Sequence, residues 1–564
     1  MSGAFNGTIK AEKAGKFFAL LGYQAAGLDD TADIGVAFSS GHAEDSEDAV
    51  DTLTLKGSLG QSRVDAVLKR LPGKGNDAGT VNLIANANNA DARALLHQLG
   101  FAANDKLKGA GSVSLQMNGP VGRPYDVSFR VNANEATLTA KGSVNDPLGA
   151  RDFTGQAEVS ASGVDTVIAA LGMPDYLGDF VKAQTTGPGF VGSSKVTMNS
   201  DGLMFNGFEV VAGHLHVAGD ATYASAQKDA LPVVTGKIES NVLDLTPVFG
   251  RGATEDARWS SAALDFSDMS FFTGNVDLKV AKLQIGTLRM DDANMHLALA
   301  SDVLSVTPMT AKMADGAASV TLRVEGGKSG EPGIGLTYKV SDADFAKLSA
   351  QVAGTSFAAG RVSLDLQAEA QGRSWLGLVS SINGVGKITT KDARLAPLNV
   401  AGYSAALAKA KTVDELSALT SDVLPSGETK VSGLDGDISV KDGMVHFERS
   451  SLALDGGTGN ITAMLDVPRL AVDSEMRITL ASPADAPGFS DVASGSIGNI
   501  SRRINAQGLQ QFASRQILAR NIQDAGLSPD ALSDLIGVAP ATKGPSIAGI
   551  PLPLQRPESH TSVQ

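Results

Sequence analysis

Apolar and polar residues alternate along most of the chain. The alternation is clearest where single polar residues separate valine, leucine, isoleucine or methionine, as in residues 113–117, 127–131, 276–280, 295–299, 362–366 and 476–480. A period of two residues is typical of antiparallel strands with one buried face and one solvated face. The sequence therefore predicts a mostly β protein.

Asp-Gly dipeptides separate several of these strands. Tight hairpin turns need residues with positive φ, which glycine and aspartate tolerate. Each dipeptide therefore predicts a hairpin; they are Asp201-Gly202, Asp315-Gly316, Asp435-Gly436, Asp442-Gly443 and Asp455-Gly456.

A short apolar segment that ends at glycine recurs along the chain. Four copies end at Gly22, Gly100, Gly172 and Gly250, which are 78, 72 and 78 residues apart, and a further copy ends at Gly354. Apolar residues at helical spacing precede each glycine, and glycine suits the left-handed residue that follows a helix. A fixed period indicates one structural unit repeated along the chain. We expect each unit to be mainly strand, with one short helix.

Longer helices are predicted only in the second half, at residues 400–419, 506–524 and 528–536. From Ala539 onward proline, glycine and serine accumulate, which indicates a disordered tail. The predicted organisation is repeated β units in 1–254, a second β module in 255–485, a helical segment in 486–538 and the tail in 539–564.

Composition narrows the possible functions. The net charge of −14 disfavours nucleic acid as a partner, because no basic face would neutralise phosphates. Cysteine is absent, which excludes disulfides, thiolate zinc sites and a cysteine nucleophile and is compatible with an oxidising compartment such as the periplasm.

The sequence has no apolar run of about 18 residues, and residues 1–23 do not resemble a signal peptide. The chain begins within a repeat unit, so we expect a membrane anchor to precede it.

Catalytic motifs were sought among the histidines and carboxylates. His214 and His216 are two residues apart and suggest either a metal site or, as we favour, strand residues with partners on the next strand. Adjacent acidic residues at 29–30 and 291–292 are expected to be solvated turn residues. HExxH, Walker and GxSxG motifs are absent from the sequence. We predict neither catalytic residues, nor a metal site, nor a cofactor.

The apolar face of such a sheet must be covered. Helices are few, and a second sheet would pack thinly because aromatic residues make up only 5% of the chain. The remaining solution is an elongated, curved antiparallel sheet that forms an apolar groove around lipid chains, with short connecting helices and C-terminal helices. A stacked-sheet scaffold without lipid is the alternative.

Three segments of the second half resemble the AsmA family of bacterial envelope proteins. They are Arg258–Gly326, with Trp259-Ser260 and Asp265-Phe266; Phe357–Leu395, with Gly372-Arg373-Ser374 and the Ile382–Gly386 run; and Arg502–Asn521. The resemblance implies a protein anchored in the inner membrane on its periplasmic side. Its partners would be phospholipids and components of the inner and outer membranes. Relatives are regarded as bridge-like lipid-transfer proteins.

On this hypothesis the groove would be lined by apolar strand residues of the second half: Val276, Leu278, Val280, Leu283, Ile285, Leu297, Leu299, Val362, Leu364 and Leu366. A basic cluster of Arg502, Arg503, Arg515 and Arg520 is expected either to contact anionic head groups or to belong to a helix that caps the open end of the sheet.

Overall fold

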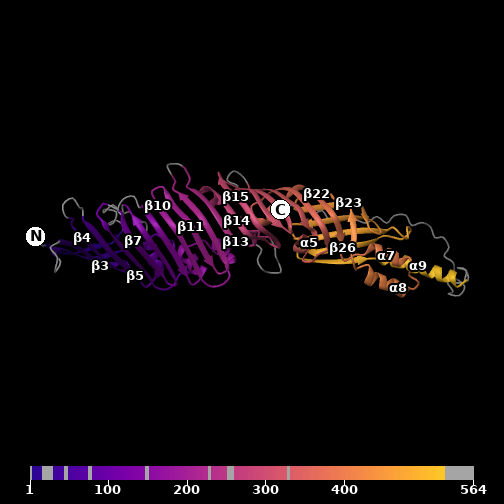
Figure 1. The fold of residues 1–564 in the computed structure, drawn as a ribbon, viewed down its shortest axis with the longest axis horizontal. Helices are drawn as coiled ribbons and strands as arrows, with labels where there is room; N and C mark the ends of the chain where they lie inside the picture. Colours follow the sequence, from indigo (N-terminus) through magenta and orange to yellow (C-terminus); the bar gives the residue numbers. More distant parts are fainter. Residues whose placement is uncertain are drawn as a thin grey trace, which may run out of the picture.

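A computed structural model describes residues 3–14, 30–42, 49–73, 79–122, 124–145, 152–226, 230–249, 259–326 and 331–526. Within these residues, 27 strands form a single sheet. Figure 1 shows an elongated molecule whose strands run across its long axis and succeed one another in chain order. The predicted long, mostly antiparallel sheet is confirmed. The predicted helix at 528–536 and the predicted tail lie outside the described residues.

The first thirteen strands are β1 (Gly3–Ala11), β2 (Ala32–His42), β3 (Ala49–Leu59), β4 (Ser62–Leu71), β5 (Thr80–Asn89), β6 (Gly111–Pro120), β7 (Tyr125–Ala133), β8 (Ala136–Val144), β9 (Phe153–Ala161), β10 (Phe190–Asn199), β11 (Gly202–Ala212), β12 (Leu215–Ala224) and β13 (Val233–Asp244). The others are β14 (Thr273–Ile285), β15 (Leu288–Ala300), β16 (Val303–Met313), β17 (Gly316–Glu325), β18 (Gly333–Asp344), β19 (Ala358–Gln371), β20 (Asn383–Leu395), β21 (Thr429–Ser432), β22 (Gly436–Lys441), β23 (Met444–Leu454), β24 (Gly457–Asp466), β25 (Ala471–Leu480), β26 (Phe489–Ser496) and β27 (Asn499–Asn505).

The helices are α2 (Ala92–Gln98), α3 (Val164–Leu171), α4 (Asp175–Gln184), α5 (Phe345–Ala353), α6 (Trp375–Ser380), α7 (Val400–Leu407), α8 (Val413–Ala418) and α9 (Gln507–Asp524). Single helical turns are η1 (Thr246–Phe249), η2 (Ser267–Ser270) and the π-helical turn η3 (Leu419–Val423).

Nearly every strand pairs with the next strand in the chain, in the antiparallel sense. Among the described strands the one parallel pair is β13 with β14, where Ile238 lies beside Leu278. A parallel pair needs a connection that returns to the starting edge of the sheet. The predicted boundary between the early repeats and the later half, at residues 254–255, thus falls between the two neighbouring strands whose direction does not reverse.

The repeat has a simple structural form. Four strands are followed by a helical segment: β2–β5 by α2, β6–β9 by α3 and α4, and β10–β13 by η1. Asp91 and Asp344 cap α2 and α5 by accepting hydrogen bonds from the backbone N–H groups of Arg93 and Lys347. Gly172 and Gly354 end α3 and α5 with φ of 62° and 78°, as the glycine positions predicted.

Four of the five predicted hairpins are confirmed; the prediction at Asp435-Gly436 is wrong. That dipeptide lies between β21 and β22, which do not pair with each other but both pair with β20 and β23. The Asp435 carboxylate accepts hydrogen bonds from the backbone N–H and hydroxyl of Thr390, at 2.7 and 3.1 Å. Asp435 therefore joins β20 to the junction of β21 and β22, which both pair with β20.

The prediction of one helix over 400–419 is also wrong in detail. The chain forms α7 and α8, separated by residues 408–412. The Thr412 hydroxyl accepts a hydrogen bond from Glu415 N, while the Glu415 carboxylate accepts one from Lys411 N at 2.7 Å. This reciprocal capping starts a new helix at residue 413. The predicted helix at 506–524 is confirmed as α9.

Candidate functional site

Most apolar residues of each strand lie on one side of the sheet, which we call the inner face. Val191 and Val211, which oppose each other on the other face, are exceptions. Residues that oppose one another on neighbouring strands form rows along the molecule. One row runs through β1–β12 and contains only apolar side chains and glycine: Ile9, Ile34, Gly57, Val64, Ala87, Val113, Val131, Leu138, Val159, Gly192, Val210 and Val217. A continuous apolar stripe thus spans these strands.

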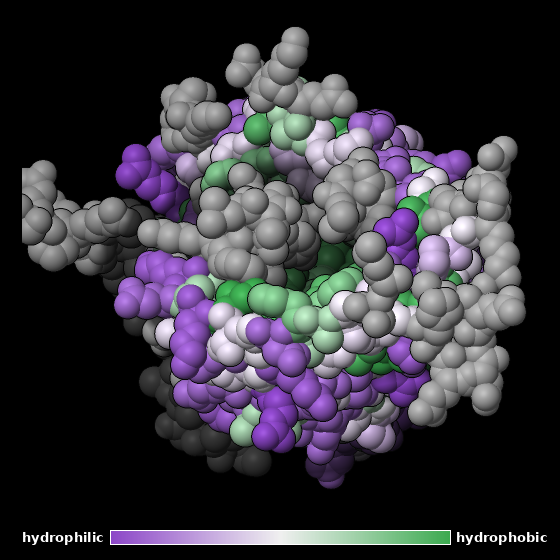
Figure 2. Space-filling model, turned by 90° about the vertical axis from the view of Figure 1, so that its left-hand side faces the viewer, coloured by the Kyte–Doolittle hydropathy of each residue, from purple (hydrophilic) through white to green (hydrophobic). Residues whose placement is uncertain are grey.

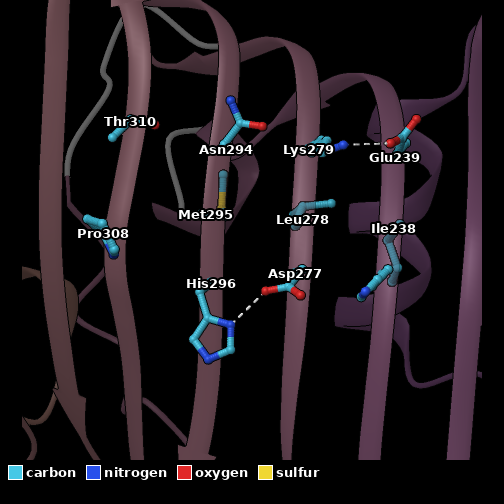
Figure 3. Close-up of a pocket in the computed structure, with 11 residues that line it drawn as sticks. Ile238, Glu239, Asp277, Leu278, Lys279, Asn294, Met295, His296, Pro308 and Thr310 are labelled. Carbon is cyan, nitrogen blue, oxygen red and sulfur yellow. Dashed lines mark hydrogen bonds and ion pairs between the residues drawn. The ribbon is translucent and has the colours of Figure 1, made fainter.

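The opposite, outer face is polar. Oppositely charged residues face each other on neighbouring strands, with Lys279 Nζ 3.0 Å from Glu239 Oε1 and Lys339 Nζ 2.9 Å from Asp365 Oδ2. Figure 3 shows Lys279 and Glu239 on adjacent strands, joined by their ion pair. Exposed pairs of this kind add little stability. They make the outer face water-soluble while leaving the inner face apolar.

The inner face of β2–β13 is open to solvent along much of its length. Residues such as Leu68, Leu115 and Phe129 are only half-buried. Phe38 is 37% exposed, and Phe5, which opposes it on β1, is 61% exposed. Figure 2, viewed from the end that carries the first strands, shows a hollow with a largely apolar wall inside a polar exterior. The inner face therefore forms the wall of a groove.

Short helices close one edge of this groove. Leu95 and Leu96 of α2 are buried against Val113 and Val131 of the inner face, and Ala169 of α3 joins the same cluster. The glycine-ended helices of the repeat thus cover the strand ends rather than the middle of the groove.

The ten predicted lining residues lie on β14, β15 and β19. Val280, Leu283 and Val362 are buried in one apolar cluster, and Leu278, Ile285, Leu297 and Leu364 pack against it. The cluster is methionine-rich, with Met290, Met295, Met309 and Met313. Leu299 is 8% exposed, and Val276 and Leu366 are half-buried on the same face. Whether these side chains contact lipid remains a prediction.

Tyr338 places a polar group in this apolar stretch. Its hydroxyl donates a hydrogen bond to Met313 Sδ at 3.0 Å, and its neighbours across the sheet are Val320 and Leu366. Desolvation raises the pKa of Tyr338 to about 12. This environment is dry enough to disfavour a charge.

At the C-terminal end the inner face is covered by helices. Tyr403 of α7, Leu416 of α8 and Leu509 of α9 are at most 2% exposed and pack with Leu452 and Ile478 of the sheet. We call α7, α8 and α9 the cap; Figure 1 shows them together at the end of the molecule that carries the last strands. Burying one such side chain contributes about 1.5–3 kcal/mol. Of the four predicted arginines, Arg515 and Arg520 lie on α9, whereas Arg502 and Arg503 lie on β27.

One ion pair lies on the inner face beside the cap. Arg502 Nε lies 2.8 and 3.0 Å from the carboxylate oxygens of Asp491, and Arg502 NH1 donates to the carbonyl of Ala396 at 2.9 Å. The Asp491 side chain is only 8% exposed and that of Arg502 is 21% exposed. Arg502 thus has protein partners for its guanidinium.

The four predicted arginines do not form one cluster. Arg503 follows Arg502 on β27 and so faces the opposite side of the sheet, and it is exposed. Arg515 and Arg520 are exposed on α9, where Arg520 NH1 donates to the carbonyl of Ala408 at 3.3 Å. Their contact with head groups stays a prediction.

The histidine and carboxylate candidates have structural partners. His214 Nδ1 accepts from Thr186 N in the turn before β12, and His216 Nε2 lies 2.9 Å from Glu209 Oε1. His296 pairs with Asp277 at 2.7 Å at a shallow cavity of about 470 Å³ on the outer face (Figure 3). In the part of the chain described here, no group of three or more His, Cys, Asp or Glu residues could hold a metal.

Asp291 and Asp292 are exposed, as expected, but they lie at an irregularity inside β15 rather than in a turn. Asp292 has a φ of 53°, and its carboxylate pairs with Lys312 Nζ at 2.7 Å. A bulge needs a residue that tolerates positive φ, which aspartate does. Asp29 lies outside the described residues.

Sequence reasoning missed the Asp491–Arg502 pair and the methionine-rich cluster. The two charges are 11 residues apart on neighbouring strands, so only the strand register shows that both face inward. The methionines were visible as apolar positions of residues 290–313. The signal for the cluster was that these methionines occupy apolar positions of two consecutive strands, β15 and β16.

The AsmA family model matches residues 200–449. This region runs from the end of β10 to β23 and includes the methionine-rich cluster and α7 and α8. No curated protein and no solved structure matches the chain. None of the helices in the described ranges is long and apolar enough to cross a membrane.

Proposed function

Because residues 200–449 form an AsmA family domain, we propose that the chain is a non-enzymatic envelope-biogenesis protein that holds or moves phospholipid acyl chains in its groove. It would act on the periplasmic side of the inner membrane. Its partners would be phospholipids and components of the inner and outer membranes.

The observation that carries this proposal is the half-exposed apolar inner face of β2–β13. A continuous apolar surface of this length is unusual where a protein is exposed to solvent, and it indicates a bound apolar partner. Each acyl CH₂ removed from water contributes about 0.8 kcal/mol, so a chain of roughly sixteen carbons is held firmly even when only half shielded. The inner-face row offers apolar contact to an acyl chain, whereas polar residues of the same face, such as Asp51 and Arg70, lie near the strand ends.

A matched pair of substitutions on β6 tests the proposal. Leu115 is half-buried on the inner face of the open groove, whereas Gln116 beside it is exposed on the outer face. Leu115→Asp should lower the phospholipid recovered per chain several-fold, because a carboxylate would lie against the acyl chain. Gln116→Asp adds the same charge and should leave loading unchanged. Equal loading of both variants and the parent chain, measured by lipid extraction and mass spectrometry, would contradict the proposal.

A scaffold that assists outer-membrane protein assembly without carrying lipid is the second candidate. It is favoured by an apolar patch at the edge of the sheet, where Phe271, Phe272, Leu231 and Val233 are 37–63% exposed. Backbone contact between Thr273 and Pro232 places these residues close together. A photo-crosslinker at Phe271 that yields protein adducts, together with a lipid-free groove, would favour the scaffold.

A further inference from the structure

The apolar inner face continues from β19 through β20, β22, β23 and β24. Across β20, β22 and β23 the opposed inner residues are Gly386, Ile438 and Phe447, and Ala463 of β24 follows. The cap therefore occupies a stretch of the same surface that is open farther along the sheet. The two stretches share one strand pattern and differ in whether helices cover them.

The cap fits this surface as a protein core does. Tyr403 is fully buried, and its ring lies 6.5 Å from that of Phe489, which is 3% exposed. Leu452 and Ile478 are fully buried beneath the helices. An acyl chain could enter here only by displacing these side chains.

Buried hydrogen bonds fasten the cap to the sheet. The hydroxyl of Thr429 accepts from Val400 N at 3.0 Å and donates to the Leu398 carbonyl at 2.7 Å. The Ser404 hydroxyl donates to the Ser482 carbonyl at 2.7 Å. Lifting the cap would leave these groups unpaired, which opposes opening.

The last hairpin is tied back to α5. Gly498 N, in the turn between β26 and β27, donates to the Val352 carbonyl at 3.2 Å. Phe345 of α5 packs against both the cap cluster and the methionine-rich cluster. These contacts hold the last hairpin in place. With the Asp491–Arg502 ion pair, they mark the point where the apolar inner face ends.

Resting on the proposed function, we infer that the groove is blind at its C-terminal end. The cap is a permanent wall, acyl chains stop before it, and they enter and leave through the open part of the groove. The cap is thus not a gate that lipid passes.

Photo-crosslinking at phenylalanine positions tests this inference in the full chain. Benzoylphenylalanine replaces Phe129 in the open part, or Phe489 under the cap, and each variant is irradiated with phosphatidylethanolamine–phosphatidylglycerol vesicles. Phe129 should give a lipid adduct, and Phe489 at least tenfold less. Comparable adducts at both positions overturn the blind end alone. Adducts at neither position overturn the proposed function and the blind end with it.

A chemical lock gives a second measurement that does not alter the buried core. Gln516 of α9 and Asp485 of the connection between β25 and β26 are exposed and line the same cavity of about 290 Å³. Gln516→Cys and Asp485→Cys would be the sole thiols, since the chain has no cysteine, and a short bismaleimide would join the cap to the sheet. Lipid loading within twofold of the unlinked variant is expected. A loss of more than fivefold would show that the cap must open.

Discussion

The open groove of β2–β13 and the capped end of β21–β27 are built from the same alternating strands. In the open groove, apolar residues such as Leu115 and Phe129 are half-exposed, whereas in the capped end Leu452 and Ile478 are fully buried. The difference arises from helices that the sequence inserts after β20 and β27. One surface can therefore serve as a binding wall or as a protein core, depending on what covers it.

The largest expected contrast comes from leucine truncation in the two regions. Leu452→Ala removes a fully buried side chain and should lower the free energy of unfolding by about 2–5 kcal/mol. Leu115→Ala removes a half-buried side chain and should cost about 1 kcal/mol or less, because solvent already reaches it. Urea unfolding with hydrogen exchange measures both. Equal costs would mean that the two regions are packed alike.

Removing Arg502 should weaken the capped end next. Arg502→Ala leaves the Asp491 carboxylate without its guanidinium partner and should cost about 2–3 kcal/mol, less than a fully buried pair because Arg502 is 21% exposed. Faster hydrogen exchange should be confined to β26, β27 and the cap. The matched Arg503→Ala variant, on the outer face, should have little effect. Similar effects of the two variants would argue against an inward-facing pair.

Two glycines of the open region separate backbone strain from crowding. Gly100 and Gly172 have φ of 89° and 62°, but an added Cβ meets nothing at Gly100 and approaches the Ala102 carbonyl oxygen at Gly172. Gly100→Ala should cost about 1 kcal/mol from the left-handed conformation alone. Gly172→Ala should cost more, because the backbone must also shift. Thermal unfolding compares them, and identical losses would contradict the predicted close contact.

The smallest expected effect concerns alkaline pH. The pKa of Tyr338 is about 12 in the folded chain, above the ordinary value of about 10. The neutral phenol is thus favoured by folding, so its contribution is present below about pH 10 and is lost as the pH rises towards 12. Tyr338→Phe should flatten the decline in stability over this interval. An unchanged decline in urea titrations would show that Tyr338 is not desolvated.

Local patterns predicted much of this fold. Alternation located the strands, and glycine positions located the ends of α3 and α5. The sequence also indicated α9, but the capping of α8 by Thr412 was hidden inside an apolar, alanine-rich run. Helix-end signals act over three or four residues and compete with the longer pattern around them.

Long-range arrangement was harder to predict. The pairing of Asp491 with Arg502 depends on register, and a shift of one residue would turn either charge outward. Leu278 and Val362 lie on the inner face in one apolar cluster, because alternation determines the face, and their contact with lipid stays a prediction. What covers that face was not encoded locally: the cap over Leu452 depends on how α7–α9 fold back onto distant strands.

The most direct test is the lipid content of the protein itself. The full chain, purified without strong detergent, would be examined by native mass spectrometry and by analysis of extracted lipid. We predict co-purified phospholipid at one or more molecules per chain, lost selectively in Leu115→Asp. A chain that is folded but free of lipid under these conditions would contradict a lipid-holding groove.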